Sequence, residues 1–235
     1  MSAIEFTSEM TVELTDKMGC DHSVTKAARV STLGDTTEYS EQSEAGLINY
    51  LVKHRHGSPF EHTSMTFRIE APIFVFREFM RHRIGFSYNE ASARYSAIPP
   101  KFYVYSAERP LVQKGKSAHP KLVAGTNEQQ AIVQACTERA YDAALYQYEW
   151  MLVAGIANEV ARAVLPVGIY STMYVTCNAR SLMAFLSLRI DDPRNTFATK
   201  PQWEIEQVAL KMDTIFADLY PLTYIAFNGN GRVAP

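Results

Sequence analysis

The sequence lacks several features that would assign it to a class at once. It has three cysteines, Cys20, Cys136 and Cys177. An odd number at wide spacing predicts neither a disulfide framework nor a zinc signature, and it favours a reducing compartment. No apolar run approaches the length of a membrane span. The N-terminus has no basic segment followed by an apolar block, so we expect no signal peptide, no membrane partner and a cytoplasmic location.

The sequence also lacks an excess of positive charge and a glycine-rich phosphate loop. Its 23 lysines and arginines are balanced by 25 aspartates and glutamates. A pI near 6.3 argues against a nucleic-acid partner, which normally selects a strongly basic domain. Residues 110–117 resemble a phosphate-binding P-loop, but Pro110 stands where the first glycine is required, so we predict an ordinary loop there.

What remains is the composition of a globular protein. Hydrophobic residues make up 47% of the chain, enough to bury a substantial core. We predict a single domain over residues 1–235. Prolines and lysines gather in residues 96–126, which we interpret as a surface excursion.

Hydrophobic periodicity and turn residues predict an α+β fold, helix-rich, around a central and mostly antiparallel sheet. Glu41–His54 is the first helix that we expect along the chain, with Ser40 as its N-cap. The later elements expected are strand 63–70, helix 73–83, a long helix from the Thr126 capping box to about Val164 with a weak point near Gly155, strand 168–176, helix 178–190 and a helix from about Pro201.

Residues 81–95 concentrate cationic and hydrogen-bonding side chains. Between Arg77 and Arg94, four arginines face two glutamates, a local charge of +2 in a chain whose net charge is −2. The polar residues beside the arginines are Ser87, Asn89, Glu90 and Ser92. Arginine binds phosphate through two parallel hydrogen bonds, so the segment suits a small anionic ligand. A solvated helix end with ion pairs is the plainer alternative.

A second cluster lies at residues 54–62 and contains four possible metal ligands, His54, His56, Glu61 and His62. A helical zinc pair needs histidines four residues apart on one continuous helix. The break at Gly57–Pro59 does not supply that geometry. We therefore predict a loop that contacts a nucleotide or cofactor, and no metal.

Two further sets of residues are candidates. Asn178 and Arg189 are eleven residues apart, which on a helix places them on one face about 16 Å from each other. They could hold opposite ends of an extended ligand or serve two sites, or the helix could simply be amphipathic with snorkelling arginines. Arg162 lies in an apolar run and needs an anionic ligand or a carboxylate, for which Glu159 is the plain structural partner.

Nucleophilic catalysis finds little support in the sequence. None of the three cysteines lies in an obvious activating setting, although Cys177 stands next to Asn178. Ser92 has no recognisable adjacent base, so we interpret it as a binding hydroxyl.

Read together and in chain order, these motifs match one family. Arg81-His82-Arg83 is followed by Ser92-Ala93-Arg94-Tyr95, and collinear matches occur at 27–31, 56–62, 71–75, 161–166, 178–182, 188–189 and 202–205. The set resembles the flavin-dependent thymidylate synthases and covers most of the chain. Three positions depart from the family pattern. Eight residues, Ile84–Ala91, separate Arg83 from Ser92, one more than usual; Ala184 replaces a frequent flavin-contacting asparagine, and Glu78 replaces a common glutamine.

The resemblance implies conversion of dUMP to dTMP with 5,10-methylenetetrahydrofolate as carbon donor, NADPH as reductant and FAD as hydride carrier. It also implies a homotetramer whose active sites form where subunits meet. The implied FAD contacts are Ser58, Arg81, His82, Arg83, Glu90, Asn178 and Arg180. The implied dUMP contacts are Glu78, Arg81, Glu90, Ala91, Ser92, Ala93, Arg94, Arg162 and Arg189. Arg189 would lie against the uracil and stabilise negative charge on the ring, and His56 would belong to the flavin and folate side.

This chemistry agrees with the residues. A chain without an activated cysteine must polarise the pyrimidine electrostatically, which a preorganised arginine can do. Two other hypotheses remain open. A nucleotide- and flavin-binding regulatory protein that has lost catalysis is weakly favoured by the extra loop residue and Ala184, and a nucleic-acid-binding module comes third.

Overall fold

The computed structural model describes residues 3–31, 40–115 and 121–235, which form two compact units. The first unit comprises Met1–Met10, Glu70–Phe76 and Glu90–Thr172. The second comprises Thr11–Ile69, Arg77–Asn89 and Met173–Pro235. Each unit is therefore assembled from segments that are far apart in the sequence.

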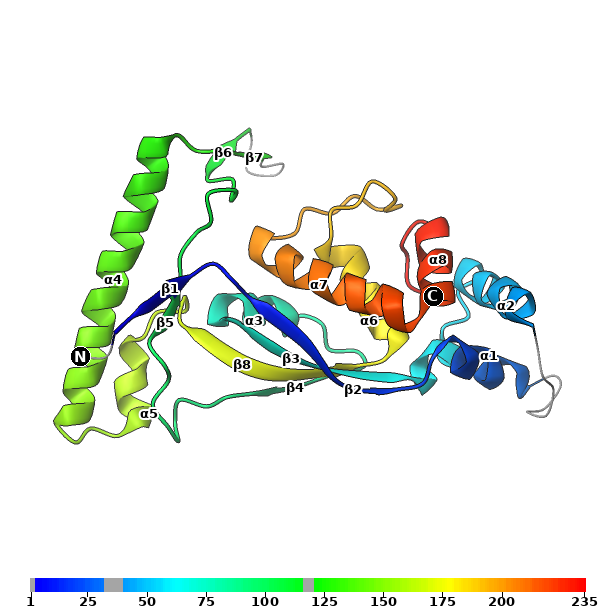
Figure 1. Ribbon diagram of the computed structural model, residues 1–235, viewed down its shortest axis with the longest axis horizontal. Helices are drawn as coiled ribbons and strands as arrows, with labels where there is room; N and C mark the ends of the chain where they lie inside the picture. The colour runs from blue at the N-terminus through cyan, green and yellow to red at the C-terminus, as the bar shows by residue number, and fades with distance from the viewer. Residues whose placement is uncertain (1–2, 32–39, 116–120) are drawn as a thin grey trace. The chain divides into compact units, whose positions relative to one another are not determined.

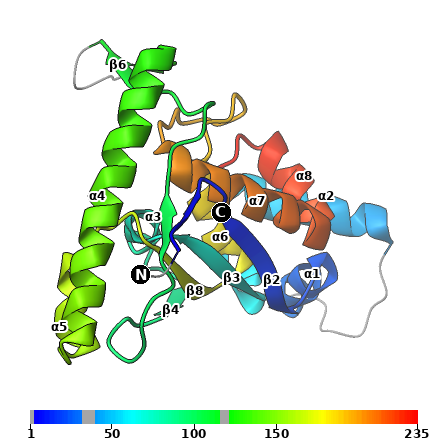
Figure 2. The ribbon, with the colours of Figure 1, turned by 60° about the vertical axis from the view of Figure 1, so that its left-hand side comes forward.

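The first unit is built around one long helix and two short strand pairs. Its elements are β1 (Glu5–Thr7), β5 (Lys101–Tyr103), β6 (Val112–Lys114), β7 (Lys121–Val123), α4 (Asn127–Val153), α5 (Asn158–Ala161) and the 3-10 turn η2 (Arg162–Val164). Strands β1 and β5 pair in parallel and lie side by side in Figure 2. Strands β6 and β7 pair antiparallel.

Part of the segment predicted as a surface excursion is buried in this unit. Phe102 and Tyr103 of β5 are almost fully buried, and the Phe102 ring stacks on Tyr141 at 4.7 Å. Leu145 and Tyr148 of α4 belong to the same core. The segment between β6 and β7, which includes Lys116 and Ser117 of the P-loop resemblance, lies outside the described residues.

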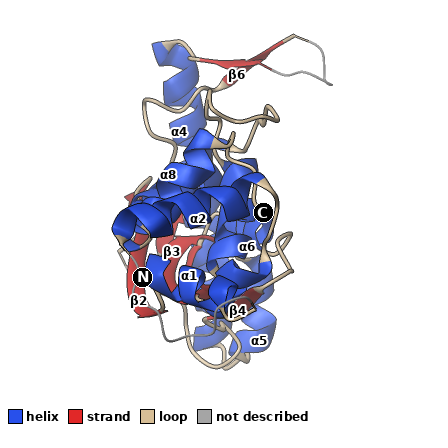
Figure 3. Ribbon diagram, turned by 90° about the vertical axis from the view of Figure 1, so that its right-hand side faces the viewer, coloured by secondary structure: helices blue, strands red, loops and turns tan. Residues whose placement is uncertain are grey.

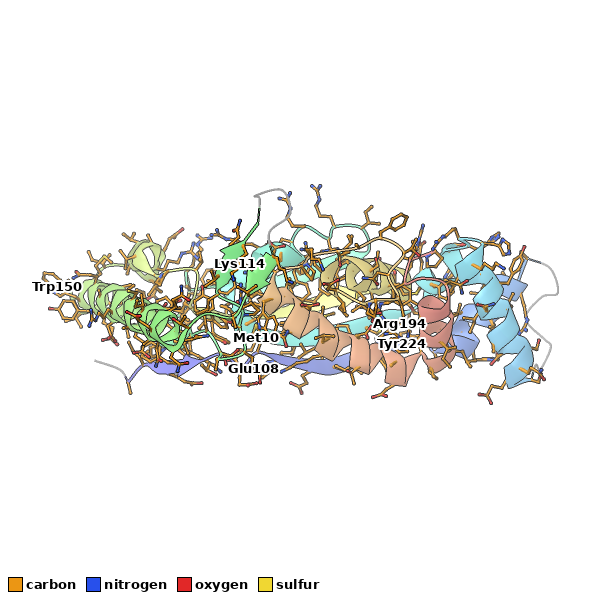
Figure 4. The ribbon with its side chains drawn as sticks, turned by 90° about the horizontal axis from the view of Figure 1, so that it is seen from above. Met10, Glu108, Lys114, Trp150, Arg194 and Tyr224 are labelled. Carbon is orange, nitrogen blue, oxygen red and sulfur yellow. The ribbon has the colours of Figure 1, made fainter. Side chains whose placement is uncertain are left out.

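Helix α4 begins where the sequence predicts, but it ends at Val153, before the predicted end near Val164. The Thr126 hydroxyl accepts from the Gln129 amide at 3.2 Å, and the Gln129 side chain accepts from the Thr126 amide at 2.9 Å. Gly155 adopts φ +80°, a left-handed conformation that ends the helix, so the predicted weak point is a complete break. Trp150 projects from the end of α4 (Figure 4). No helix in the described ranges combines the length and low polarity needed to cross a bilayer.

The second unit combines helices with most of a four-stranded sheet. Its elements are β2 (Thr11–Met18), α1 (Asp21–Arg29), α2 (Glu41–Lys53), the 3-10 turn η1 (Ser58–His62), β3 (Ser64–Pro72), α3 (Ile73–Phe79), β4 (Phe86–Glu90), β8 (Tyr170–Cys177), α6 (Ala179–Arg189), α7 (Trp203–Leu219) and α8 (Pro221–Gly229). The last residues of β3, the first of α3, the end of β4 and the start of β8 belong to the first unit by residue range.

The sheet has the strand order β2-β3-β8-β4 and is antiparallel, which confirms the expected α+β class. In β3, Met65, Phe67 and Ile69 are fully buried while the residues between them are partly exposed, as the two-residue period of a strand requires. Helices α6 and α7 pack on each other beside the sheet (Figure 1). Figure 3 shows the strands of this sheet among α1, α2 and α6.

Two helices were not predicted from the sequence, and one predicted helix ends earlier than expected. The helix predicted to be first is preceded by α1, whose pattern contains a single large buried apolar residue, Val24. Helix α3 ends at Phe79, four residues before the predicted end at Arg83. Helix α8 was missed because Tyr220 and Pro221, which divide α8 from α7, read as the end of the last helix.

Candidate functional site

Arg189, the last residue of α6, is held by three hydrogen bonds within the second unit. Its Nη1 donates to a Glu78 carboxylate oxygen at 2.7 Å, and its Nη2 donates to the Glu78 backbone carbonyl at 3.2 Å. Its Nε donates to Nε2 of His82 at 2.9 Å. The Arg189 side chain is 16% exposed. The structure therefore brings together Glu78 and Arg189, which the resemblance assigns to dUMP, and His82, which it assigns to FAD.

His82 is neutral in this arrangement. Burial and the neighbouring Arg189 charge lower the pKa of His82 to about 4, from an ordinary value of 6.5. A neutral imidazole keeps one nitrogen as an acceptor, which Arg189 uses. The ring also meets Phe185 edge-on, with centroids 4.9 Å apart.

Tyr88 fixes the turn that carries His82. Its hydroxyl lies 2.7 Å from the Phe79 carbonyl and 2.7 Å from the His82 carbonyl, and it donates to this pair. The sequence analysis missed Tyr88. The signal available was an alternating strand pattern at Phe86–Glu90, but the pattern alone does not tell which carbonyl a hydroxyl reaches.

The Arg-His-Arg loop lies against the start of α6. Gly85 adopts φ +68°, and a Cβ there would come within 2.1 Å of the Ser181 hydroxyl oxygen. Asn178 caps α6 by accepting from the Ser181 amide at 2.8 Å. Arg81 and Arg83 are exposed and form no ion pair within the described ranges. Arginines without a carboxylate partner, next to a glycine that permits close approach of the backbone, suit an anionic ligand.

The loop after α2 forms a second cluster in this unit. Arg180 forms an ion pair with Glu61 and donates from Nε to the Pro235 carbonyl at 2.6 Å. A Cβ on Gly57 would lie 2.4 Å from that Nε, so only glycine fits. Arg55, which the sequence analysis did not single out, has φ +62° and donates to the Val233 carbonyl at 2.6 Å.

The two remaining predicted residues of this loop are exposed. His56 stacks on Tyr50 with ring centroids 5.7 Å apart, and Ser58 begins η1. Among the described residues, no group of three or more His, Cys, Asp and Glu side chains is placed to hold a metal ion.

The predicted nucleotide residues from Glu90 to Arg94 belong to the first unit. Ala91 and Ser92 line a pocket of about 120 Å³, whose other lining residues are Glu70, Ser96, Ala97, Ile98, Pro99, Lys101, Tyr170, Ser171 and Thr172. Ala93 is buried, and the Arg94 amide lies 3.3 Å from the Ser92 hydroxyl oxygen. Burial raises the pKa of Glu90, and the buried Ser171 hydroxyl of the same pocket has no hydrogen-bond partner among the described residues. The sequence analysis missed Ser171.

The interpretation of Arg162 as a charge paired with Glu159 was wrong. Glu159 pairs with Arg94, whose Nε lies 3.0 Å from the carboxylate. Arg162 is half-buried in η2, because the neighbouring Val160 and Val164 are exposed and do not enclose it. Among the described residues, no carboxylate forms an ion pair with Arg162.

Cys177, the cysteine next to Asn178, is not an activated nucleophile. Cys177 is buried, and burial raises the pKa of its thiol far above the ordinary value. Cys20 and Cys136 are exposed and unpaired with each other. The described side chains thus offer cationic, hydrogen-bonding chemistry rather than thiolate chemistry.

Comparisons with known proteins agree with one another. A family model described as thymidylate synthase complementing protein matches residues 13–222. A protein of Streptomyces coelicolor named flavin-dependent thymidylate synthase is 54% identical over 99% of this chain and 96% of its own. One of Tropheryma whipplei with the same name is 50% identical over 98% of this chain and 97% of its own. The crystal structure of PolB from Streptomyces cacaoi, a UMP/dUMP methylase bound with 5-Br dUMP, superposes with a TM-score of 0.94 at 49% identity and covers 99% of this chain and 100% of its own.

Proposed function

Because this chain belongs to the flavin-dependent thymidylate synthase family, we propose that it methylates dUMP to dTMP with a bound flavin. Relatives named as enzymes match almost the whole chain, which favours this function over the regulatory alternative. The supporting observation is the guanidinium of Arg189, a partly buried cation that three hydrogen bonds hold in place and that has N–H groups left for a ligand.

The residues of the second unit fit a flavin dinucleotide. FAD carries a pyrophosphate, and Arg81 and Arg83 offer unanswered charges beside the close approach of Gly85 to α6. Ser58, His82, Asn178 and Arg180 are the further proposed contacts, and His56 is proposed for the flavin and folate side. The flavin, when bound, supplies hydride chemistry that no side chain provides.

The residues of the first unit are proposed to bind the nucleotide phosphate. Ser92 and the backbone amides of Ala91 and Ala93 offer donors, and Arg94 offers charge. The Arg94–Glu159 pair is half exposed on both sides, so it is worth no more than about 1 kcal/mol and a phosphate can replace the carboxylate. Among the described residues no carboxylate forms an ion pair with Arg162, which is proposed as a second phosphate ligand. Glu90 is proposed as a ligand of both dUMP and FAD.

Arg189 is proposed to activate the pyrimidine. Carbon 5 of uracil becomes nucleophilic when negative charge on the ring is stabilised, and a fixed cation of low exposure does this without reorganisation. Neutral His82 adds no competing charge beside it. Burial of Cys177, which raises the pKa of its thiol far above the ordinary value, disfavours attack by that thiolate on carbon 6.

The remaining parts of the proposal rest on the family resemblance. NADPH is proposed as reductant and 5,10-methylenetetrahydrofolate as carbon donor. A homotetramer whose sites use more than one subunit is proposed as the assembly, together with a cytoplasmic location. Sedimentation of the purified protein near four times the mass of a 26.5 kDa chain would support the tetramer, and a monomer at working concentration would contradict it.

Steady-state turnover tests the proposal. The purified protein should be yellow or become so on addition of FAD, and it should release dTMP and oxidise NADPH when dUMP and methylenetetrahydrofolate are both present. Each substrate is omitted in turn as a control. A protein that binds no flavin, or that binds flavin but forms no dTMP, would contradict the function. UMP is assayed beside dUMP, because PolB is described as a UMP/dUMP methylase.

A further inference from the structure

We propose that Glu78 acts through Arg189 as a positioning residue, jointly with His82, and is not itself a ligand of the pyrimidine. The inference rests on the proposed function, which supplies the role of Arg189. It departs from the substrate contact that the sequence implied for Glu78. The observation that carries it is the arrangement of hydrogen bonds around one guanidinium.

The hydrogen bonds leave a defined part of Arg189 free. A guanidinium has five N–H groups in a rigid plane. One on each of its three nitrogens is committed, to His82, to the Glu78 carboxylate and to the Glu78 carbonyl. Two N–H groups remain, one on each terminal nitrogen. Glu78 thus contributes two of the three anchors, from its side chain and from its backbone.

Release of Glu78 to bind the base would be costly. The Arg189 side chain is 16% exposed and that of Glu78 is 35% exposed, so the pair is partly shielded from solvent, mainly on the arginine side. Withdrawal of the carboxylate would leave a largely buried cation without its partner. A carboxylate is also an acceptor only, whereas uracil offers two carbonyl acceptors and a single N–H, so Glu78 could meet the base at one point at most.

His82, the other residue that holds Arg189, is itself held in place by its neighbours. His82 accepts from Arg189 only with an unprotonated Nε2, and its ring is wedged against Phe185. The turn that carries it is tied by the Tyr88 hydroxyl. Glu78 and His82 therefore restrain the guanidinium plane from two directions, and that plane sets where the free N–H groups point.

A double-mutant cycle tests the inference. Glu78→Ala, Arg189→Ala and the double variant are loaded with FAD and assayed for dTMP formation, for KM of dUMP and for flavin content. Misplacement of an activating group lowers the rate by about 100-fold, so Glu78→Ala should lower kcat on that order while KM for dUMP changes less than about threefold. In the Arg189→Ala background, the added Glu78→Ala change should have no further effect on kcat.

Additive effects in the cycle, or a Glu78→Ala variant that raises KM and leaves kcat intact, would overturn the inference. Glu78→Gln retains an acceptor for Nη1 and should recover most of the lost rate if the variant with alanine folds poorly; failure of Glu78→Gln to exceed Glu78→Ala would also count against it. Glu13→Ala, which removes a surface carboxylate near Arg68, is the matched control and should be unchanged. Wild-type protein that makes no dTMP would instead defeat the proposed function.

Discussion

His82 and Arg189 show how the surroundings of a side chain determine its chemistry. A histidine beside a cation and largely removed from water is neutral, because both factors disfavour a second proton. The neutral ring can then accept a hydrogen bond from that cation. Protonation would replace this hydrogen bond with repulsion between two positive groups, so the arrangement around Arg189 depends on His82 remaining unprotonated.

The titration of His82 should therefore be displaced to low pH. Its folded pKa of about 4 lies below the ordinary value of 6.5, so the unfolded chain takes up a proton over this range that the folded chain refuses. Its contribution to stability is complete above pH 6.5 and is lost as the pH falls towards 4. Nuclear magnetic resonance of the labelled imidazole should give a midpoint near 4, and a midpoint near 6.5 would contradict this.

Replacement of Arg189 should separate binding from chemistry. Arg189→Ala should retain FAD, because the proposed flavin contacts lie at other residues, but its rate of dTMP formation should fall by about 100- to 1,000-fold. Arg189→Lys should recover little, because an ammonium cannot occupy all three anchors of a planar fork. Flavin absorbance and product release are measured on the same preparation. Unchanged turnover in Arg189→Ala would show that the activating role is misplaced.

Helix α6 organises the second unit by carrying functional groups at both ends. Asn178 caps its start and Arg189 ends it, so the two residues lie at opposite ends, as their spacing predicted. Two glycines permit the close approach of other segments to its first turns, Gly85 at Ser181 and Gly57 at Arg180. The first turns of this helix therefore tolerate little added volume.

Gly85→Ala should destabilise the protein. The backbone there has φ +68°, and the new methyl group would meet the Ser181 hydroxyl oxygen at 2.1 Å. We expect a loss of more than about 1 kcal/mol in the free energy of unfolding. Gly46→Ala is the control: Gly46 lies in α2 with no atom within 4 Å of a Cβ, and the alanine should stabilise by about 0.5–1 kcal/mol. Denaturant unfolding of both variants measures the difference, and equal effects would contradict it.

Elements with strong periodicity or caps could be predicted from the sequence, and those fixed by distant partners could not. The Ser40 and Thr126 caps mark the starts of α2 and α4 because a cap is a local hydrogen bond. Strand β1 has three residues and exists through its pairing with β5, about a hundred residues later. A local pattern contains no information about such a partner, so β1 and β5 escaped prediction.

The same distinction holds within the site. The residue types identified the cationic segment. They did not show that Arg189 donates to Glu78 and His82, or that Glu159 pairs with Arg94. Arg55 carried no local signal, because the carbonyls of Val233 and Ala234 to which it donates lie far along the chain.

At the scale of the whole molecule, the buried charge of Arg232 makes the free energy of unfolding depend on its contacts with other elements. The Arg232 side chain is fully buried and donates to Asp213 at 2.7 Å and to Asn228 at 2.6 Å. Asp213 also accepts from the Tyr224 hydroxyl at 2.7 Å, and Figure 4 shows Tyr224 beside Arg194. The end of the described chain is thereby fastened to α7.

Asp213→Ala should cost about 3 kcal/mol in the free energy of unfolding, because it leaves a buried guanidinium without its counter-ion. Asp218→Ala, an exposed position on the same helix, is the matched control and should change stability by less than about 0.5 kcal/mol. Thermal or denaturant unfolding of both variants gives the comparison. If the Asp213→Ala variant is as stable as the control, the Asp213–Arg232 ion pair makes no net contribution to the free energy of unfolding.

The reaction itself is tested most directly by one anaerobic turnover. The flavin of the purified protein is reduced with NADPH, excess NADPH is removed, and dUMP with methylenetetrahydrofolate is added while the flavin absorbance is followed. We expect the oxidised flavin spectrum to return and dTMP to form in an amount equal to the flavin. A flavin that stays reduced, or that is reoxidised without dTMP, would contradict it.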